Sequence, residues 1–270
     1  MEHLVVNQPE RTFEEFYKDE EKDMNNFSYW FPYVKDIFKC PQTVIIKLPI
    51  PVADTVLEDK REKNKEKVRQ FVESECLPKI RENITTISPF VFMKNARFSN
   101  KFDFNNSCRV YKETDDITNK LCYINYAGMC VDALGFTEVV FREFIDFEDE
   151  ETATIYNGMP IRPEYRVFYD FDKKKIVHIH DYWDFDYVYG NLQTLTDKIV
   201  FSNVKDDYQE KWKEYLPLIQ ETVEKSRINE VTNLKGCWSM DFLYANEEVY
   251  LIDMAQAKNS AYREYCKVEV

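Results

Sequence analysis

GCWSMDFLYANEEVYLIDMA (residues 236–255) reads as two apolar strands around a turn at Ala245–Glu248, which is the pattern of a β-hairpin. Each strand carries one aspartate, Asp241 or Asp253, inside an otherwise apolar run. A carboxylate in such a position is costly to desolvate, and two on neighbouring strands repel each other unless a cation lies between them. Magnesium takes one or two carboxylates together with phosphate oxygens, so it is the natural candidate. Aspartates that cap turns or pair with lysine are the alternative.

Upstream, FVFMKNARFSNKFDF (90–104) predicts an apolar strand, a polar turn and a second aromatic strand, which together form another hairpin. Lys94 and Lys101 lie at either side of the turn at 95–100. Lysines in this position hold phosphate groups as point charges. Plain surface lysines are the alternative interpretation.

EYRVFYDF (164–171) and KKIVHIHDYWD (174–184) predict two adjacent strands. Arg166 lies in a strand otherwise filled with Val, Phe and Tyr, so its guanidinium needs an anionic partner. That partner is either a bound anion or a carboxylate, with Glu164 and Asp181 as the candidates.

His178 and His180 share one face of the second of these strands because strand side chains alternate. An H-x-H pair binds zinc only with a third ligand, and the only other histidine is His3. A zinc site therefore has little support. A base or substrate contact near a cleft is the functional alternative to ordinary strand positions.

The remaining segments predict a mixed architecture. VVFREFID (139–146) is a strand that is apolar at first and then acidic. Helices are expected over 12–40, 54–82 and 205–228, and a short strand over 43–50. This order of elements predicts an α+β fold with largely antiparallel sheets.

Composition excludes several classes of protein. The net charge of −13 disfavours non-specific nucleic-acid binding. The chain holds only 5 glycines, and neither GxxxxGK[ST] nor GxGxxG occurs, so a nucleotide site must use lysines and strand backbone instead of a glycine cradle. The KxDG motif of RNA ligases is also absent.

The seven cysteines are scattered without a CxxC pair, which predicts reduced thiols in a cytosol-like compartment. The charged N-terminus has no apolar core of a signal peptide. No apolar stretch approaches the roughly 18 residues that span a membrane. A cytoplasmic protein is therefore expected.

Taken in order, the lysine hairpin, VVFREFID, EYRVF, HDYWD, WSMDFL and LIDM resemble the ATP-grasp fold, in particular the branch that includes the cell-division-cycle assembly proteins and uncharacterised phage and bacterial relatives. The resemblance covers about residues 90–256. It implies two lobes whose antiparallel sheets enclose a nucleotide cleft for ATP and Mg²⁺. The implied division is a helix-rich N-terminal region at 1–89, a first lobe at 90–140, and a second lobe with the metal site at 141–270.

The resemblance also implies roles for single residues. Lys94 is similar to the first-lobe lysine that contacts the phosphates, and Lys101 to a second phosphate contact. Arg166 is similar to the strand arginine that faces the transferred phosphate, and Asp241 and Asp253 to the metal ligands. The implied hinge that receives adenine is Arg142, Glu143, Phe144 and Ile145, with Asp146 as the acceptor for ribose.

The implied activity is that of an ATP-dependent ligase. It would form an acyl-phosphate on a carboxylate, with Lys94 and Arg166 as catalytic cations, for attack by an amine or other nucleophile. The alternative is a non-catalytic ATP-binding assembly or interaction module. Most ATP-grasp enzymes carry an asparagine two residues after the second acid, where this chain has Ala255. Ala255 cannot bind metal, and this departure puts turnover in more doubt than ATP binding.

Overall fold

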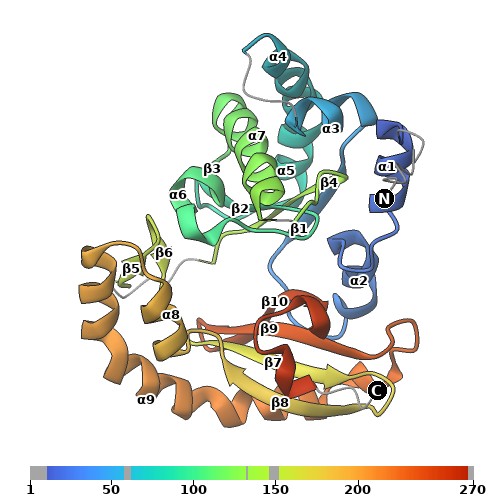
Figure 1. The fold of residues 1–270 in the computed structure, drawn as a ribbon. Coiled ribbons are helices and arrows are strands. Elements are labelled where there is room, and N and C mark those ends of the chain that lie inside the picture. The colour runs from blue at the N-terminus through green and yellow to red at the C-terminus, as the bar shows by residue number, and fades with distance from the viewer. Residues whose placement is uncertain (1–10, 58–61, 132, 146–151, 267–270) are drawn as a thin grey trace, which may run out of the picture.

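A computed structural model describes residues 11–57, 62–131, 133–145 and 152–266 of the protein. Two four-stranded antiparallel sheets lie one above the other, each with helices on its outer side (Figure 1). This arrangement confirms the predicted α+β class with antiparallel sheets. None of the helices in the described ranges combines the length and the apolarity that a membrane crossing requires.

The first sheet has the strand order β1-β4-β2-β3. Its strands are β1 (Thr43–Lys47), β2 (Phe90–Asn95), β3 (Arg109–Tyr111) and β4 (Glu138–Glu143). Val91 and Phe141 face a core under the helices. Because strand side chains alternate, Lys94 and Arg142 point to the opposite face, toward the second sheet. The helices of this lobe are α3 (Ile50–Leu57), α4 (Glu62–Phe71), the π-helix η1 (Val72–Cys76), α5 (Leu77–Asn83) and α7 (Thr114–Cys130).

The second sheet has the strand order β10-β9-β7-β8. Its strands are β7 (Glu164–Asp170), β8 (Lys175–Asp181), β9 (Cys237–Ala245) and β10 (Glu248–Gln256). One face buries Tyr165, Met240 and Phe242 in a second core. Residues of α9 (Leu195–Lys225), which follows the outer side of this sheet in Figure 1, pack into the same core. The other face carries Arg166 and Asp241 toward the first sheet.

Two N-terminal helices, α1 (Phe13–Glu20) and α2 (Phe27–Val34), precede the first strand. α1 packs on the core of the first sheet through Tyr17, whereas α2 connects the two sheets. Phe27 and Trp30 are buried in the core of the second sheet. The backbone N–H of Phe27 nevertheless donates to the Ala96 carbonyl of the first lobe at 3.0 Å. Both β1 and α2 precede residue 90. β1 is nevertheless a strand of the first sheet, and α2 contributes to the core of the second sheet. The division of the chain into three units stays a prediction.

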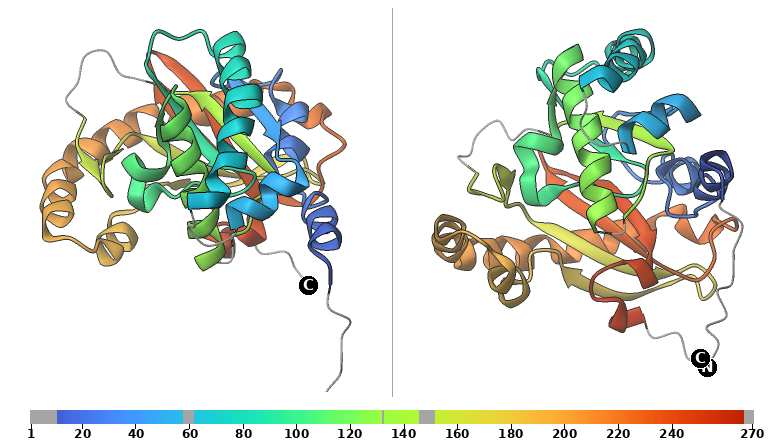
Figure 2. Two further views of the ribbon diagram at one scale, coloured as in Figure 1. Left: turned by 90° about the horizontal axis from the view of Figure 1, so that it is seen from above. Right: turned by 45° about the horizontal axis from the view of Figure 1, so that its top comes forward.

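A third core closes one side of the space between the sheets, where α8 and the β5–β6 hairpin lie in Figure 1. The two views in Figure 2 show the same elements beside the sheets. The elements on this side are α6 (Phe104–Ser107), β5 (Thr154–Ile155), β6 (Met159–Pro160) and α8 (Phe185–Asn191). The remaining short helices are η2 (Lys101–Asp103), η3 (Arg227–Glu230), η4 (Ala257–Asn259) and η5 (Arg263–Cys266).

Four sequence expectations differ from the structure, and the first is the helix expected over 12–40, which is divided into α1 and α2. The predicted second strand at the end of 90–104 is instead η2 followed by α6, because the Asn95 side chain accepts from two following backbone N–H groups and turns the chain. The helix expected over 54–82 divides into α3, α4, η1 and α5. The helix expected at 205 begins ten residues earlier, after the N-cap Thr194.

Candidate functional site

One row of side chains crosses the inner face of the second sheet. In the strand register, His180 is opposite Arg166, Arg166 is opposite Asp241, and Asp241 is opposite Asp253. Residues directly opposite each other in antiparallel strands point to the same face. The structure therefore places Asp241 and Asp253 side by side on neighbouring strands, as predicted, and it places Arg166 next to Asp241.

Arg166 and Asp241 form a bidentate ion pair in this row. The Arg166 Nε and a terminal nitrogen each donate to one oxygen of Asp241, both at 2.8 Å. Both side chains are largely buried. Burial opposes the charged guanidinium, but the adjacent Asp241 carboxylate outweighs it and raises the pKa of Arg166. The carboxylate partner of Arg166 is thus Asp241, whereas the sequence suggested Glu164 or Asp181.

Lys94 reaches across from the first sheet to Asp253. Its Nζ lies 2.8 and 2.7 Å from the two carboxylate oxygens. The lysine is 3% exposed, whereas the aspartate side chain is 29% exposed. Lys94 is therefore not a surface lysine, and the alternative that a strand aspartate pairs with lysine holds for Asp253.

Lys101 lies on η2, in a small network with second-lobe residues. Its Nζ donates to the Tyr182 hydroxyl at 2.9 Å and lies 3.5 Å from a Glu164 oxygen. Burial raises the pKa of the Glu164 carboxyl, and the ammonium of Lys101 opposes that shift. The Tyr182 ring also stands 4.3 Å from Lys101 Nζ and 4.9 Å from the Arg166 guanidinium. Tyr182 thus connects two predicted phosphate contacts.

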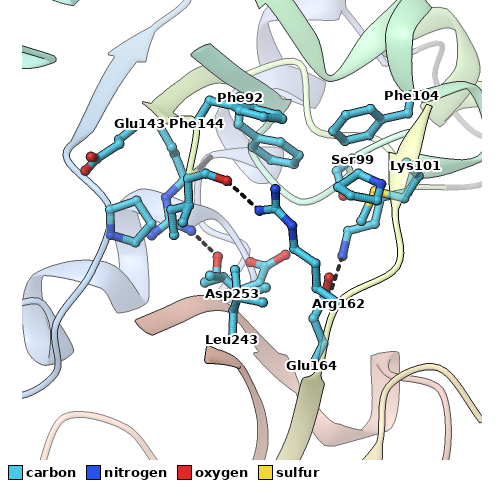
Figure 3. A pocket seen from close by; sticks show the side chains of 16 residues that line it. Phe92, Ser99, Lys101, Phe104, Glu143, Phe144, Arg162, Glu164, Leu243 and Asp253 are labelled. Carbon is cyan, nitrogen blue, oxygen red and sulfur yellow. Dashed lines mark hydrogen bonds and ion pairs between the residues drawn. The ribbon is translucent and has the colours of Figure 1, made fainter. Parts of the chain in front are cut away.

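A pocket opens between the two sheets beside these pairs, and Figure 3 shows its lining. It holds about 650 Å³ of non-atom space, which includes its open mouth. Its apolar wall is formed by Phe92, Phe104, Phe144, Met159, Pro160 and Leu243. Its charged residues are Lys101, Arg142, Glu143, Arg162, Glu164 and Asp253. An apolar wall with a few convergent charged groups is typical of a small-molecule site.

The predicted hinge contributes to this pocket in unequal ways. The Arg142 guanidinium is buried and donates to the backbone carbonyls of Leu251, at 3.3 Å, and Ile252. Arg142 therefore ties the first sheet to β10. Phe144 and Ile145 line the pocket, and the Ile145 carbonyl accepts from Arg162.

The two remaining residues of the predicted hinge are Glu143 and Asp146. A Glu143 oxygen accepts from the Gln42 backbone N–H at 3.1 Å, and in Figure 3 this side chain points away from Lys101 and Arg162. Asp146, the predicted ribose acceptor, lies outside the described residues. The hinge role stays a prediction.

The chemistry of the two aspartates fits a magnesium ion that completes its coordination with phosphate oxygens and water. Among the described residues, no group of three or more His, Cys, Asp or Glu side chains is arranged to hold a metal ion. Ala255 lies opposite Ser239, one step along the same face from Asp253. The Gln256 backbone N–H donates to Asn25 instead, at 2.8 Å. An all-protein magnesium cage is therefore absent from this part of the chain, while a carboxylate pair is present.

His178 and His180 do share one face of β8, with ring centroids 5.7 Å apart. The Tyr262 ring packs against His180 edge-on at 3.9 Å. Burial lowers the pKa of both histidines. Neither belongs to a cluster that could hold a metal within the described ranges.

The prediction of reduced thiols is wrong for two of the seven cysteines. Cys237 and Cys266 form a disulfide, whereas the other five are free. The partners are 29 residues apart, and only the return of the chain after the β9–β10 hairpin brings η5 to the start of β9. Spacing in the sequence carries no signal for this pairing.

Sequence reasoning assigned no ligand contact to Arg162, Glu164 or Tyr182, which complete the polar part of the site. The motif RPEYR contains Arg162 and Glu164 at alternating positions, and both line the pocket. That alternation was the available signal. Tyr182 lies just after β8 and carried no signal of its own.

No protein-family model matches the chain, and no curated protein sequence matches it. Among solved structures, C-terminally truncated Cdc123 from Schizosaccharomyces pombe aligns with a TM-score of 0.53 at 13% identity, covering 91% of this chain and 88% of that chain. Another structure of Cdc123 from the same yeast gives a TM-score of 0.49 at 13% identity, over 87% of this chain and 85% of that one. D-Alanine-D-alanine ligase from Helicobacter pylori gives 0.35 at 14% identity, over 86% and 50%. The truncated Cdc123 structure supports a shared fold alone, which agrees with the order of motifs: the chain has an ATP-grasp-like fold similar to that of Cdc123.

Proposed function

We propose that this protein binds ATP together with magnesium in the pocket between its two sheets. The observation that carries the proposal is the meeting of an apolar aromatic wall with Lys101, Arg142 and Arg162 in one pocket of an acidic chain. The apolar wall suits a planar base, and the cations suit a polyphosphate. Asp253 lines the same pocket and supplies a carboxylate for the metal.

The two ion pairs at the base of the site have the matching chemistry. Lys94 and Asp253 neutralise each other across the lobes, and one suits a phosphate while the other suits a magnesium ion. Arg166 and Asp241 form a second pair of the same kind. A bound magnesium ion supplies charge neutralisation on phosphate oxygens. The chain itself contributes the position and the charge of Lys94 and Arg166.

The reaction that this site supports best is ADP-forming ligation. In such a reaction a carboxylate is activated by phosphorylation and attacked by an amine or another nucleophile. Arg166 and Lys94 stabilise negative charge that is spread over the transferred group, which is the main contribution of a protein to phosphoryl transfer. A cytoplasmic location, where ATP and magnesium are supplied, is part of this proposal.

One observation favours a second candidate, a non-catalytic ATP-binding assembly or interaction module. Ala255 stands where a third metal ligand is expected, and its neighbour Gln256 uses its backbone to bind Asn25. A site with two carboxylates binds nucleotide, yet it controls a second metal ion less firmly.

Calorimetric titration with ATP, with and without magnesium, tests the binding proposal. Wild type is compared with Lys101→Met, which removes a pocket cation, and with Met159→Trp, which fills the pocket without a change of charge. Lys225→Met, on an exposed lysine at the end of α9, is the matched control. We expect magnesium-dependent binding that both pocket variants weaken by tenfold or more, roughly 1.4 kcal/mol, and the control leaves unchanged. Equal affinity in all four proteins overturns the proposal.

Turnover separates the two candidates. ADP and phosphate that appear only with a carboxylate acceptor and a nucleophile support the ligase. Tight binding without any hydrolysis or transfer, across a panel of small carboxylates, supports the interaction module. Release of AMP and pyrophosphate contradicts the ligase chemistry.

A further inference from the structure

The Cys237–Cys266 disulfide joins the start of β9 to the segment that follows β10. It shares no lining residue with the pocket between the two sheets. Cys237 is the first residue of β9, and Cys266 is the last residue of η5. Their Cα atoms are 6.5 Å apart, within the range that a disulfide spans. Cys237 is half-buried and Cys266 is buried, so an attacking thiol reaches the sulfur of Cys237 first.

A groove of about 730 Å³ of non-atom space, which includes open solvent, is lined in part by Cys237 and Cys266. Three of its eight lining residues are the cations Lys235, Lys258 and Arg263, and none is acidic. The lining is thus cationic on a chain whose net charge is −13. Two carboxylates lie beside it: Asp172 accepts from the Gly236 backbone N–H at 3.0 Å, and Asp170, opposite Cys237 in the strand register, pairs with Lys173. Cations beside a sulfur stabilise a thiolate, either attacking or leaving, and they raise the local concentration of anions.

We propose that this groove is a thiol–disulfide exchange site for small anionic thiols, that is, thiols that carry carboxylate groups. The thiolate of such a molecule attacks the Sγ of Cys237, the S–S bond breaks, and Cys266 leaves as a thiolate that takes a proton. A second anionic thiol attacks the resulting mixed disulfide and releases Cys237. Two ligand thiols are oxidised to one ligand disulfide, and the protein gains two electrons and two protons.

The disulfide holds a defined segment in place. Residues 257–266 pack on the inner face of the second sheet, where Phe168 and Ala257 form a small core with Cys266. The same segment brings Tyr262 against His180, the residue opposite Arg166 in the register. Reduction breaks the disulfide between this segment and β9, whereas the small core, the Ser260–Ser239 hydroxyl contact and the ring contacts of Tyr262 with His180 and Tyr187 do not depend on it.

The test compares the rates at which three thiols reduce the disulfide in the full chain. Glutathione is anionic, 2-mercaptoethanol is neutral and cysteamine is cationic, and each rate is divided by the rate of the same thiol on a small unstructured disulfide. Timed alkylation and mass spectrometry follow Cys237 and Cys266. Cys130, which is exposed and free, is the internal standard for alkylation. The variants are Lys258→Glu/Arg263→Glu and, as a matched control for charge, Lys225→Glu.

We expect the double variant to slow glutathione roughly tenfold, to leave 2-mercaptoethanol unchanged and to speed cysteamine. High salt should remove the difference, and Lys225→Glu should behave as wild type. A proportional change with all three thiols, or no change with any, overturns the proposal. So does protein prepared without reductant in which both cysteines alkylate as free thiols. None of these outcomes depends on whether the protein binds ATP.

Discussion

Lys94 of the first sheet places its ammonium 2.8 and 2.7 Å from the two carboxylate oxygens of Asp253 in the second sheet. The two partners are buried to different extents, with side-chain exposures of 3% and 29%. An ion pair between two sheets thus has one buried end and one partly solvated end. Removal of the Lys94 charge and removal of the Asp253 charge should therefore lower the free energy of unfolding by different amounts.

The first prediction follows from this inequality. Asp253→Asn leaves a buried ammonium without its counter-charge, and this should lower the free energy of unfolding by about 3 kcal/mol. Lys94→Met leaves a carboxylate that water still reaches, so its cost should be smaller by 1 kcal/mol or more. Urea denaturation of both variants measures the difference. Equal costs would contradict the asymmetric burial of the pair.

The second prediction concerns the bidentate contact of Arg166. Arg166→Lys keeps the charge but cannot reproduce two parallel hydrogen bonds to Asp241, and it should lower the free energy of unfolding by about 1 to 2 kcal/mol. Arg166→Met leaves the buried Asp241 carboxylate unpaired and should cost about 3 kcal/mol. Thermal or urea unfolding gives the order of the three proteins. If lysine serves as well as arginine, the planar geometry contributes nothing.

The third prediction restores a missing ligand. Ala255 lies one step along the inner face from Asp253 and opposite Ser239. Ala255→Asn places an amide oxygen there and should tighten the magnesium-dependent part of ATP binding several-fold, or roughly 1 kcal/mol. Titration of ATP at several magnesium concentrations measures it. Ala255→Leu, which fills the same space without an oxygen, is the control and should weaken binding.

The fourth prediction concerns pH. Burial raises the pKa of Asp181 from its ordinary 3.8 to about 6, although the Tyr208 hydroxyl and the Trp183 N–H donate to its carboxylate. Between these two pH values the folded protein holds more protons than the unfolded chain. The contribution of Asp181 to stability therefore falls as pH rises from about 4 to about 6 and is constant above.

Asp181→Asn keeps an acceptor oxygen for Tyr208 and Trp183 but removes this dependence. The free energy of unfolding of the variant minus that of wild type should therefore increase by roughly 1 to 2 kcal/mol when the pH rises from 4.5 to 7.5. Urea unfolding at both pH values provides the comparison, with the exposed Asp207→Asn as control. A gain that is the same at both pH values would mean that Asp181 titrates normally in the folded protein.

Much of the second sheet could be predicted from the sequence, because its strands alternate apolar and polar residues with period two. The hairpin of β9 and β10 lies where the pattern of 236–255 predicts it, and Asp241 and Asp253 are opposite each other. The strand that carries Arg166 was also predicted. Local alternation decides which face a side chain takes, so it was sufficient for these residues.

The partners within the site could not be predicted, because they depend on contacts between distant segments. Lys94 and Asp253 are 159 positions apart, and neither sequence segment contains a pattern that indicates the other as its partner. Lys101 was expected at the start of a strand, but the Asn95 turn places it on η2, where it meets Tyr182. One side-chain hydrogen-bond pattern therefore changed both an element and the partner of a predicted ligand.

The N-terminal helix α2 determines whether the two lobes unfold separately or together. Its Phe27 and Trp30 complete the core of one sheet, while its backbone is hydrogen-bonded to Ala96 and to the Glu138 carboxylate of the other. Neither lobe keeps its native surroundings once α2 leaves, so the two should melt together in one cooperative transition. A scanning calorimeter should then find the van't Hoff and calorimetric enthalpies equal, as for a small one-domain protein, although the ribbon suggests two halves.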